Sequence, residues 1–279
     1  MSFTHPQQSG QGLDVAVDAI RPIVHDRLRA LEADRGLRVL FACESGSRAW
    51  GFASYDSDFD VWFIYVRPAD AYLKLKPPAD AFDIHDDSEH DLDLAGWDIR
   101  KTAELMRKSN GPLFEWLDSP IVYEQDDRIT PRLVRLRNDY FDPKKTTYHY
   151  LSLAARVWKS YLLDQPNPVR KKYLYALRPL ACVEYIRAHG AQPPTRFQSV
   201  LDAIPLEPTV SDAIQKLVAD KQANRELGAA PADPVLQQWI GETLASGDRL
   251  AADLDANPID NALLDCLIAD AILMPEVHA

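Results

Sequence analysis

The spacing of apolar residues gives the first half of the chain a mixed helical and extended character. Apolar positions recur at helical spacing over residues 13–33, which predicts an amphipathic helix. Short apolar or aromatic runs bounded by turns predict strands, and helical spacing then returns. The predicted strands cover residues 37–42, 59–66 and 92–95, and the predicted helices cover 97–108 and 113–117.

The second half shows helical periodicity alone. Helices are predicted over residues 148–163, 171–189, 211–227 and 233–254. Asp233-Pro234 fits the start of the last of these, an N-cap followed by proline at the first helical position. The change places a boundary near Asp142-Pro143. We therefore expect an α/β domain over residues 1–142, with a mixed sheet flanked by helices, and an all-helical domain over residues 143–279.

The net charge and its distribution along the chain limit the kinds of ligand that the protein can be expected to bind. A net charge of −11 argues against a general nucleic-acid binder held by charge alone. Residues 80–93 hold seven acidic residues and no Lys or Arg, whereas residues 143–178 hold eight basic residues and one acidic residue, Asp164. A solvated surface is the ordinary explanation of such runs. The alternative is an acidic metal-holding region that faces a basic phosphate-holding region.

The compartment follows from what the sequence lacks. No apolar run approaches the ~20 residues of a membrane span, and the first residues have neither the basic start nor the apolar core of a secretion signal. The three cysteines, Cys43, Cys182 and Cys266, are widely separated and have no metal-site spacing. We expect a cytoplasmic protein without a membrane partner. The oligomeric state is not indicated.

A turn with phosphate-binding chemistry follows the first predicted strand. Gly46-Ser47 leaves that strand and opens a helical turn, so that backbone N–H groups and one hydroxyl form a concavity suited to a phosphate. Gly-Ser turns are common and mostly structural, so this signal alone is weak.

Two carboxylates open the second predicted strand. Asp58 and Asp60 point to the same face because side chains alternate along a strand. They repel each other unless a cation lies between them, and oxygen ligands suit Mg²⁺ or Mn²⁺. A polar strand entrance is the structural alternative. It suits Asp56 better than this pair, which has no obvious basic partner.

The combination resembles the DNA polymerase β superfamily of nucleotidyltransferases, and within it the YcgL-like group associated with RNA repair. The resemblance rests on ESGSRAWG at residues 44–51 and DSDFDV at residues 56–61. It is supported by GWDIRK at 96–101, FEWL at 114–117 and KYLYALRP at 172–179. It leads us to expect an arginine after the Asp-x-Asp-Val run, where this chain has Trp62. Lys221 and Glu226 also fit the group, without an assigned role.

The resemblance implies a third carboxylate on a later strand. Asp91 and Asp93 share a strand face, so side-chain alternation leaves both as candidates for the third carboxylate. The order of residues in the family, with the acid just before the apolar pair that precedes Gly-Trp, favours Asp93 and keeps Asp91 as the second candidate. With Asp58 and Asp60, Asp93 would then hold two divalent ions.

The helix predicted over residues 171–189 supplies the expected phosphate contacts. Lys171, Tyr175 and Arg178 share one face by spacing, and for Lys171 a solvated face is about as good an explanation as function. By analogy with polymerase β-like enzymes, Lys172 and Arg178 are the candidates, beside Tyr175. Gly46, Ser47 and Arg48 complete the predicted substrate-binding set.

The predicted activity is transfer of a nucleotidyl group from an NTP to a hydroxyl acceptor. An RNA 3′ end, a protein hydroxyl and a small molecule all remain open as acceptor. The alternative is a non-catalytic nucleotide or nucleic-acid sensor on the same fold, which the intact Ser47, Asp58 and Asp60 oppose and Trp62 favours. A phosphatase of the haloacid-dehalogenase kind is disfavoured, because Val61-Trp62 and a continuing strand follow the aspartates.

Overall fold

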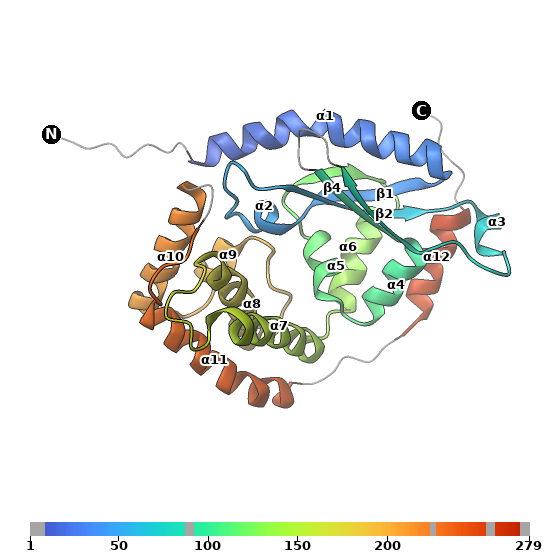
Figure 1. Cartoon of the computed structure of the whole chain (residues 1–279). Helices are drawn as coiled ribbons and strands as arrows, with labels where there is room; N and C mark the ends of the chain where they lie inside the picture. The colour runs from blue at the N-terminus through green and yellow to red at the C-terminus, as the bar shows by residue number, and fades with distance from the viewer. Residues whose placement is uncertain (1–8, 87–91, 224–226, 255–259, 274–279) are drawn as a thin grey trace.

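A sheet lies between one long helix and a group of helices on its other face in the computed structural model of the chain (Figure 1). The structure describes residues 9–86, 92–223, 227–254 and 260–273. Among the helices of these ranges, none combines the length and apolar character that a membrane crossing needs.

In the described residues, five strands form one sheet in the order β3-β4-β2-β1-β5. The strands are β1 (Arg38–Glu44), β2 (Phe59–Val66), β3 (Ala81–Asp86), β4 (Leu92–Asp98) and β5 (Val122–Gln125). β2 and β4 run parallel, whereas β1 pairs antiparallel with β2 and with β5, and β3 pairs antiparallel with β4. The predicted mixed sheet flanked by helices is thereby confirmed.

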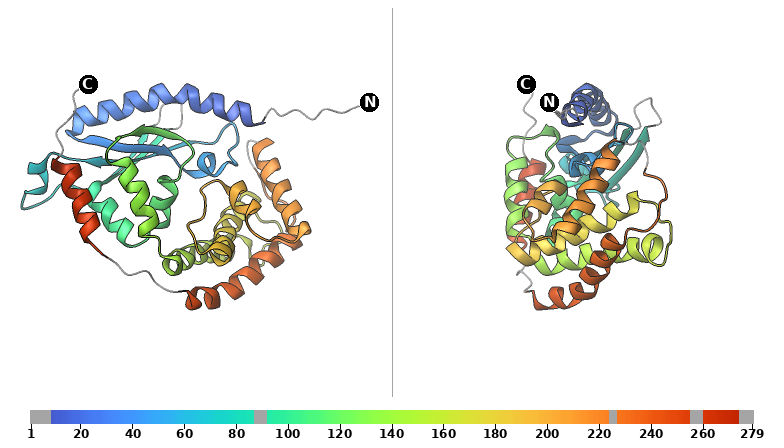
Figure 2. Two further views of the ribbon diagram at one scale, coloured as in Figure 1. Left: turned by 180° about the vertical axis from the view of Figure 1, so that it is seen from behind. Right: turned by 90° about the vertical axis from the view of Figure 1, so that its left-hand side faces the viewer.

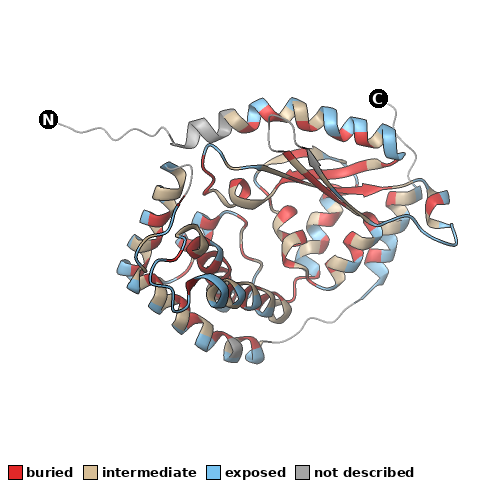
Figure 3. Cartoon of the chain, in the orientation of Figure 1, coloured by how far each residue is buried: buried red, intermediate tan, exposed pale blue. Residues whose placement is uncertain are grey.

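Helix α1 (Ser9–Arg35) covers one face of the sheet. Its inner positions, such as Val24 and Leu28, are buried against strand residues that include Phe63 and Leu94. Its outer face is largely exposed (Figure 3). This division explains the amphipathic spacing in the sequence.

The opposite face carries the larger core. It is covered by α4 (Ile99–Arg107), α5 (Gly111–Trp116) and α6 (Thr130–Asp139), and α12 (Ala262–Leu273) returns from the end of the chain to pack against α4 (Figures 1 and 2). Short helices α2 (Gly46–Trp50) and α3 (Ala69–Tyr72) flank the ends of β1 and β2.

The second half of the chain is helical throughout its described elements. They are α7 (Pro143–Val157), the π-helical turn η1 (Trp158–Leu162), α8 (Lys171–His189), α9 (Phe197–Asp202), α10 (Pro208–Ala223) and α11 (Pro234–Asp253). α7 begins earlier than the spacing predicts because the Asp142 carboxylate caps it, accepting a 3.0 Å hydrogen bond from the Lys145 backbone N–H.

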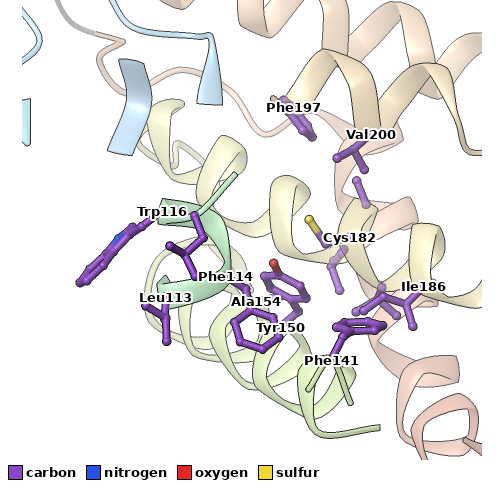
Figure 4. Packing of buried hydrophobic residues seen from close by; sticks show 14 of the residues in the cluster. Leu113, Phe114, Trp116, Phe141, Tyr150, Ala154, Cys182, Ile186, Phe197 and Val200 are labelled. Atoms are coloured by element: carbon purple, nitrogen blue, oxygen red, sulfur yellow. The ribbon is translucent and has the colours of Figure 1, made fainter. Parts of the chain in front are cut away.

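One hydrophobic cluster crosses the predicted boundary at residues 142 and 143. It joins Ile64 of β2 with Tyr150 of α7, Cys182 of α8 and Leu267 of α12. Part of this cluster is seen in Figure 4, where Trp116 points away from Tyr150 and Cys182. Helix α12, from the end of the chain, packs against α4 of the first half. The division into two domains stays a prediction.

Candidate active site

The glycine that opens α2, two residues after β1, is fitted closely to an aspartate of β2. Gly46 has φ +58°, and a Cβ at this position would lie 2.2 Å from Asp60 Oδ2. The neighbouring Ser45 N–H donates a 2.8 Å hydrogen bond to the Asp60 carbonyl. A residue with a side chain would therefore meet both backbone strain and the carboxylate, so glycine is required for two separate reasons.

Three carboxylates gather where β2 and β4 run in parallel. The register pairs Asp60 directly with Asp93, and Asp58, just before β2, lines the same cavity as Asp60. The pKa of Asp60 is raised to about 6, first by burial and then by the charges of Asp58 and Asp93, against the lowering effect of Arg48. The reserve candidate Asp91 lies outside the described residues.

The donor set fits a cation that is completed by substrate. Within the described ranges, no group of three His, Cys, Asp or Glu side chains converges closely enough to hold a metal ion unaided. Mg²⁺ is usually held by one or two carboxylates together with phosphate oxygens and water, rather than by an all-protein cage. Asp60 meets that description, because its carboxylate is half-buried and is repelled by two neighbouring carboxylates.

A fourth carboxylate, Glu44, fixes the backbone beneath this site. It is fully buried, and its Oε1 accepts a 3.0 Å hydrogen bond from the Asp60 N–H while its Oε2 accepts a 2.6 Å bond from the Tyr123 hydroxyl. Burial raises the pKa of Glu44 to about 7. The sequence prediction assigned Glu44 no role, although an acid at the end of an otherwise buried apolar strand was a usable signal.

Arg48 holds the turn before β2. Its Nε donates to the Asp58 carbonyl at 3.0 Å, its Nη2 donates to the Ser57 carbonyl, and its guanidinium lies 3.8 Å from the centre of the Phe59 ring. The side chain is buried, and this burial lowers the pKa of Arg48. These contacts let Arg48 hold the turn that carries Asp58, and its predicted phosphate contact stays a prediction.

A cavity of about 350 Å³ opens over the carboxylates; we call it the carboxylate cavity. Its lining residues are Gly46, Ser47, Trp50, Phe52, Asp56, Ser57, Asp58, Asp60, Lys171, Leu174, Tyr175 and Lys221. The sheet side thus supplies the acids and the Ser47 hydroxyl, and the helical side supplies two lysines and a tyrosine.

Lys221 reaches this cavity from α10. Figures 1 and 2 show α10 beside the segment that joins α2 to β2. There, Lys221 Nζ donates a 2.6 Å hydrogen bond to Ser54 Oγ, and the neighbouring Gln222 amide donates to the Gly51 carbonyl at 3.0 Å. Helical spacing could place Lys221 on a surface of α10 but could not show which loop that surface faces. Glu226 lies outside the described residues.

Helix α8 divides its predicted phosphate ligands between different surroundings. Lys171 and Tyr175 line the carboxylate cavity. Burial raises the pKa of the Tyr175 hydroxyl, and the charges of Asp60 and Asp58 add to that rise. Lys172 does not line this cavity: its Nζ lies 4.3 Å from the centre of the Tyr161 ring and 5.7 Å from that of Tyr175.

Arg178 is buried in an ion pair one turn further along α8. Its Nη1 lies 2.9 Å from Glu115 Oε1, and its guanidinium lies 4.4 Å from the centre of the Trp50 ring. The pKa of Arg178 is raised well beyond its ordinary value by Glu115, against the effect of burial. Arg178 lines a second, adjoining cavity and is paired with Glu115 there, and its predicted phosphate contact stays a prediction.

Comparison with known families matches residues 20–270 to the family described as RNA repair pathway DNA polymerase beta. The chain belongs to this family. The RNA repair pathway DNA polymerase beta family is of the nucleotidyltransferase type, which usually uses divalent metals. Membership of this family supports the assignment of the chain to the transferases.

Two individual proteins are similar to this family member. It is 37% identical over 236 residues to the uncharacterized protein YcgL of Bacillus subtilis (strain 168), a match covering 84% of this chain and 89% of that protein. A nucleotidyltransferase-like protein from Exiguobacterium sibiricum 255-15, known from its crystal structure, is similar with 14% identity and a TM-score of 0.31. That match covers 80% of this chain and 73% of the other.

Proposed function

We propose that this chain is a metal-dependent nucleotidyltransferase that transfers a nucleotidyl group from an NTP to a hydroxyl acceptor. The observation that carries the proposal is a cavity wall shared by Asp58, Asp60, Ser47 and two lysines. Asp93, the register partner of Asp60 on β4, stands beside that wall. Carboxylates that repel each other beside cationic side chains suit a cation and a polyphosphate together.

In this proposal, the acceptor oxygen attacks the α-phosphorus of the NTP. The bond from that phosphorus to the bridging oxygen breaks, and pyrophosphate leaves. Divalent ions held by Asp58, Asp60 and Asp93, two being expected, would lower the pKa of the acceptor hydroxyl and neutralise the charge on the phosphates.

The chain's own residues bind and orient the reactants. Ser47, Lys171 and Lys221, which line the carboxylate cavity, would contact the phosphates, with charge-assisted bonds from the lysines. Asp93 accepts the proton of the acceptor hydroxyl. Glu44 and Gly46 hold Asp60 in position.

An RNA 3′ end is the acceptor that the family description favours. The second candidate function is a nucleotide or nucleic-acid sensor. It is favoured by Arg48 and Arg178, because both guanidinium groups are paired within the protein and neither lines the carboxylate cavity.

The test separates these functions through two carboxylates. Asp93→Asn should abolish transfer of labelled nucleotide to RNA yet keep NTP affinity within about tenfold, because Asp93 serves attack more than binding. Asp58→Asn should reduce both, and Asp70→Asn on α3, which is exposed and outside the cavity, should change neither. Wild-type protein that binds NTP but transfers nothing to RNA, protein or small hydroxyl compounds would establish the sensor instead.

A further inference from the structure

A second cavity, of about 450 Å³, adjoins the carboxylate cavity and is walled by indole rings; we call it the tryptophan cavity. Four of the six tryptophans of the chain line it: Trp50, Trp62, Trp97 and Trp116. The two cavities share Trp50, Leu174 and Tyr175, so they form adjacent compartments of one site.

Two of the indoles, those of Trp62 and Trp97, come from β2 and β4, the strands that carry Asp60 and Asp93. Trp62 follows Asp60 by two residues on the same face of β2, about 6.6 Å along the strand. The Trp62 and Trp97 rings each lie 4.0 Å, centre to centre, from the ring of Trp116. Trp116 is buried, whereas Trp62 and Trp97 are only partly covered. The partly covered rings of Trp62 and Trp97 therefore present part of their apolar surface to the cavity.

Among the described residues of the cavity wall, the one carboxylate is already paired with a cation. Glu115 accepts hydrogen bonds from Trp50 Nε1 at 3.0 Å, from the Tyr150 hydroxyl at 3.0 Å and from Arg178 at 2.9 Å. Its charge is matched by the buried Arg178 guanidinium. The wall therefore does not repel a ligand that carries phosphates.

Polar side chains complete the wall. His149, Asn110 and Arg156 line the cavity, and burial lowers the pKa of His149. The neutral imidazole offers one donor and one acceptor, and the Asn110 amide nitrogen offers donors, while its Oδ1 caps α5 by accepting from the Leu113 N–H at 3.0 Å. Planar apolar walls with a few donors and acceptors are the chemistry of a site for an aromatic heterocycle.

We propose that the tryptophan cavity binds a nucleobase of the substrate, stacked on the exposed part of the Trp62 and Trp97 rings. This deepens the proposed function and rests on it, because the neighbouring carboxylate cavity would then hold the attached phosphates. The base comes either from the donor NTP or from the terminal nucleotide of an RNA acceptor, since both present the same heterocycle to the rings.

The test compares ligands with and without a base. Binding of each of the four NTPs and of inorganic tripolyphosphate is measured by calorimetry with Mg²⁺, and binding of a short single-stranded oligoribonucleotide is measured by tryptophan fluorescence in EDTA. The variants are Trp62→Ala and Trp62→Phe, with Trp239→Ala on α11 as a matched control that lines neither cavity. Unfolding midpoints establish that each variant is folded.

Loss of stacking predicts that Trp62→Ala weakens a base-bearing ligand about fivefold to 150-fold. Tripolyphosphate affinity should stay within about twofold, since stacking is the interaction lost. Trp62→Phe should keep most of the affinity, and Trp239→Ala all of it. An effect on NTP assigns the donor base, and an effect on the oligoribonucleotide alone assigns the acceptor base.

Two results would overturn the nucleobase proposal: equal losses for tripolyphosphate and NTP in Trp62→Ala, or no loss for any base-bearing ligand. The proposed function fails differently. NTP binding that is identical in EDTA and in Mg²⁺ would refute metal dependence, while the oligoribonucleotide measurement, made without metal, would still report on the cavity.

Discussion

Replacing Gly46 with alanine separates backbone strain from obstruction of the Asp60 carboxylate. The left-handed conformation at φ +58° costs an alanine about 1–2 kcal/mol. The new Cβ, 2.2 Å from Asp60 Oδ2, forces the carboxylate to move, at a further cost of about 1–3 kcal/mol by analogy with overpacked sites. We expect Gly46→Ala to lower the free energy of unfolding by about 2–5 kcal/mol and to remove Mg²⁺-dependent NTP binding.

Gly36 provides the matched control. Its φ is +57°, and a Cβ there would meet nothing within 4 Å. Gly36→Ala should therefore show the backbone cost alone, about 1–2 kcal/mol, with normal NTP binding.

Urea unfolding and calorimetry of the two variants, repeated for Gly46→Ala in an Asp60→Ala background, complete a double-mutant cycle. Removing the carboxylate should reduce the cost of Gly46→Ala to that of Gly36→Ala. Equal costs for the two glycines in the wild-type background, with NTP binding retained by both, would refute the argument.

Three further outcomes are expected. The pKa of Asp60 is raised to about 6, so its ionised form destabilises the fold. The protonated carboxyl therefore contributes its full stability below about pH 4, and this contribution is lost as the pH rises through about 6. Asp60→Asn should then gain about 1–2 kcal/mol over wild type at pH 7.5, after discounting for partial exposure, but little at pH 4; equal gains in urea unfolding at both pH values would contradict this. Arg178→Ala should cost about 3–5 kcal/mol because Glu115 stays buried without its cation, and adding Glu115→Gln should recover part of that loss in the same assay. Lys171→Ala should weaken NTP binding about tenfold or more in calorimetry, whereas Lys172→Ala, next to it but outside the carboxylate cavity, should not.

Elements with strong periodicity were predictable from the sequence. The bounds of β2 and α8 coincide with the predicted ranges, because a β-branched and aromatic run ended by proline and a long helical repeat leave little choice. The strands β3 and β5 and the helix α6 (Thr130–Asp139) were not predicted. They are short or polar, and they owe their structure to the neighbours they pack on.

The acids of the site were predictable, but their companions were not. Alternation along β2 puts Asp58 and Asp60 on one face, whereas the adjacency of Asp60 and Asp93 depends on a parallel pairing that joins distant segments. On α8, spacing groups Lys171 with Arg178. Only the position of Glu115 decides that Arg178 is a buried structural cation, while Lys171 faces the carboxylates.

The parallel register of β2 and β4 has a consequence for how such a protein can diversify. In both strands, one set of alternate residues, including Phe63 and Leu94, is held under α1, and the other set carries Asp60 and Asp93. If either strand shifted its pairing by one residue, a carboxylate would point into the apolar layer under α1. The position of the aspartates therefore depends on the packing of α1. Lys171 and Lys221, in contrast, come from helices that this register does not constrain. The same is true of the residues of the tryptophan cavity that lie on helices. Substitutions on α8 and α10 can thus change which substrate is held while the arrangement of the aspartates stays the same.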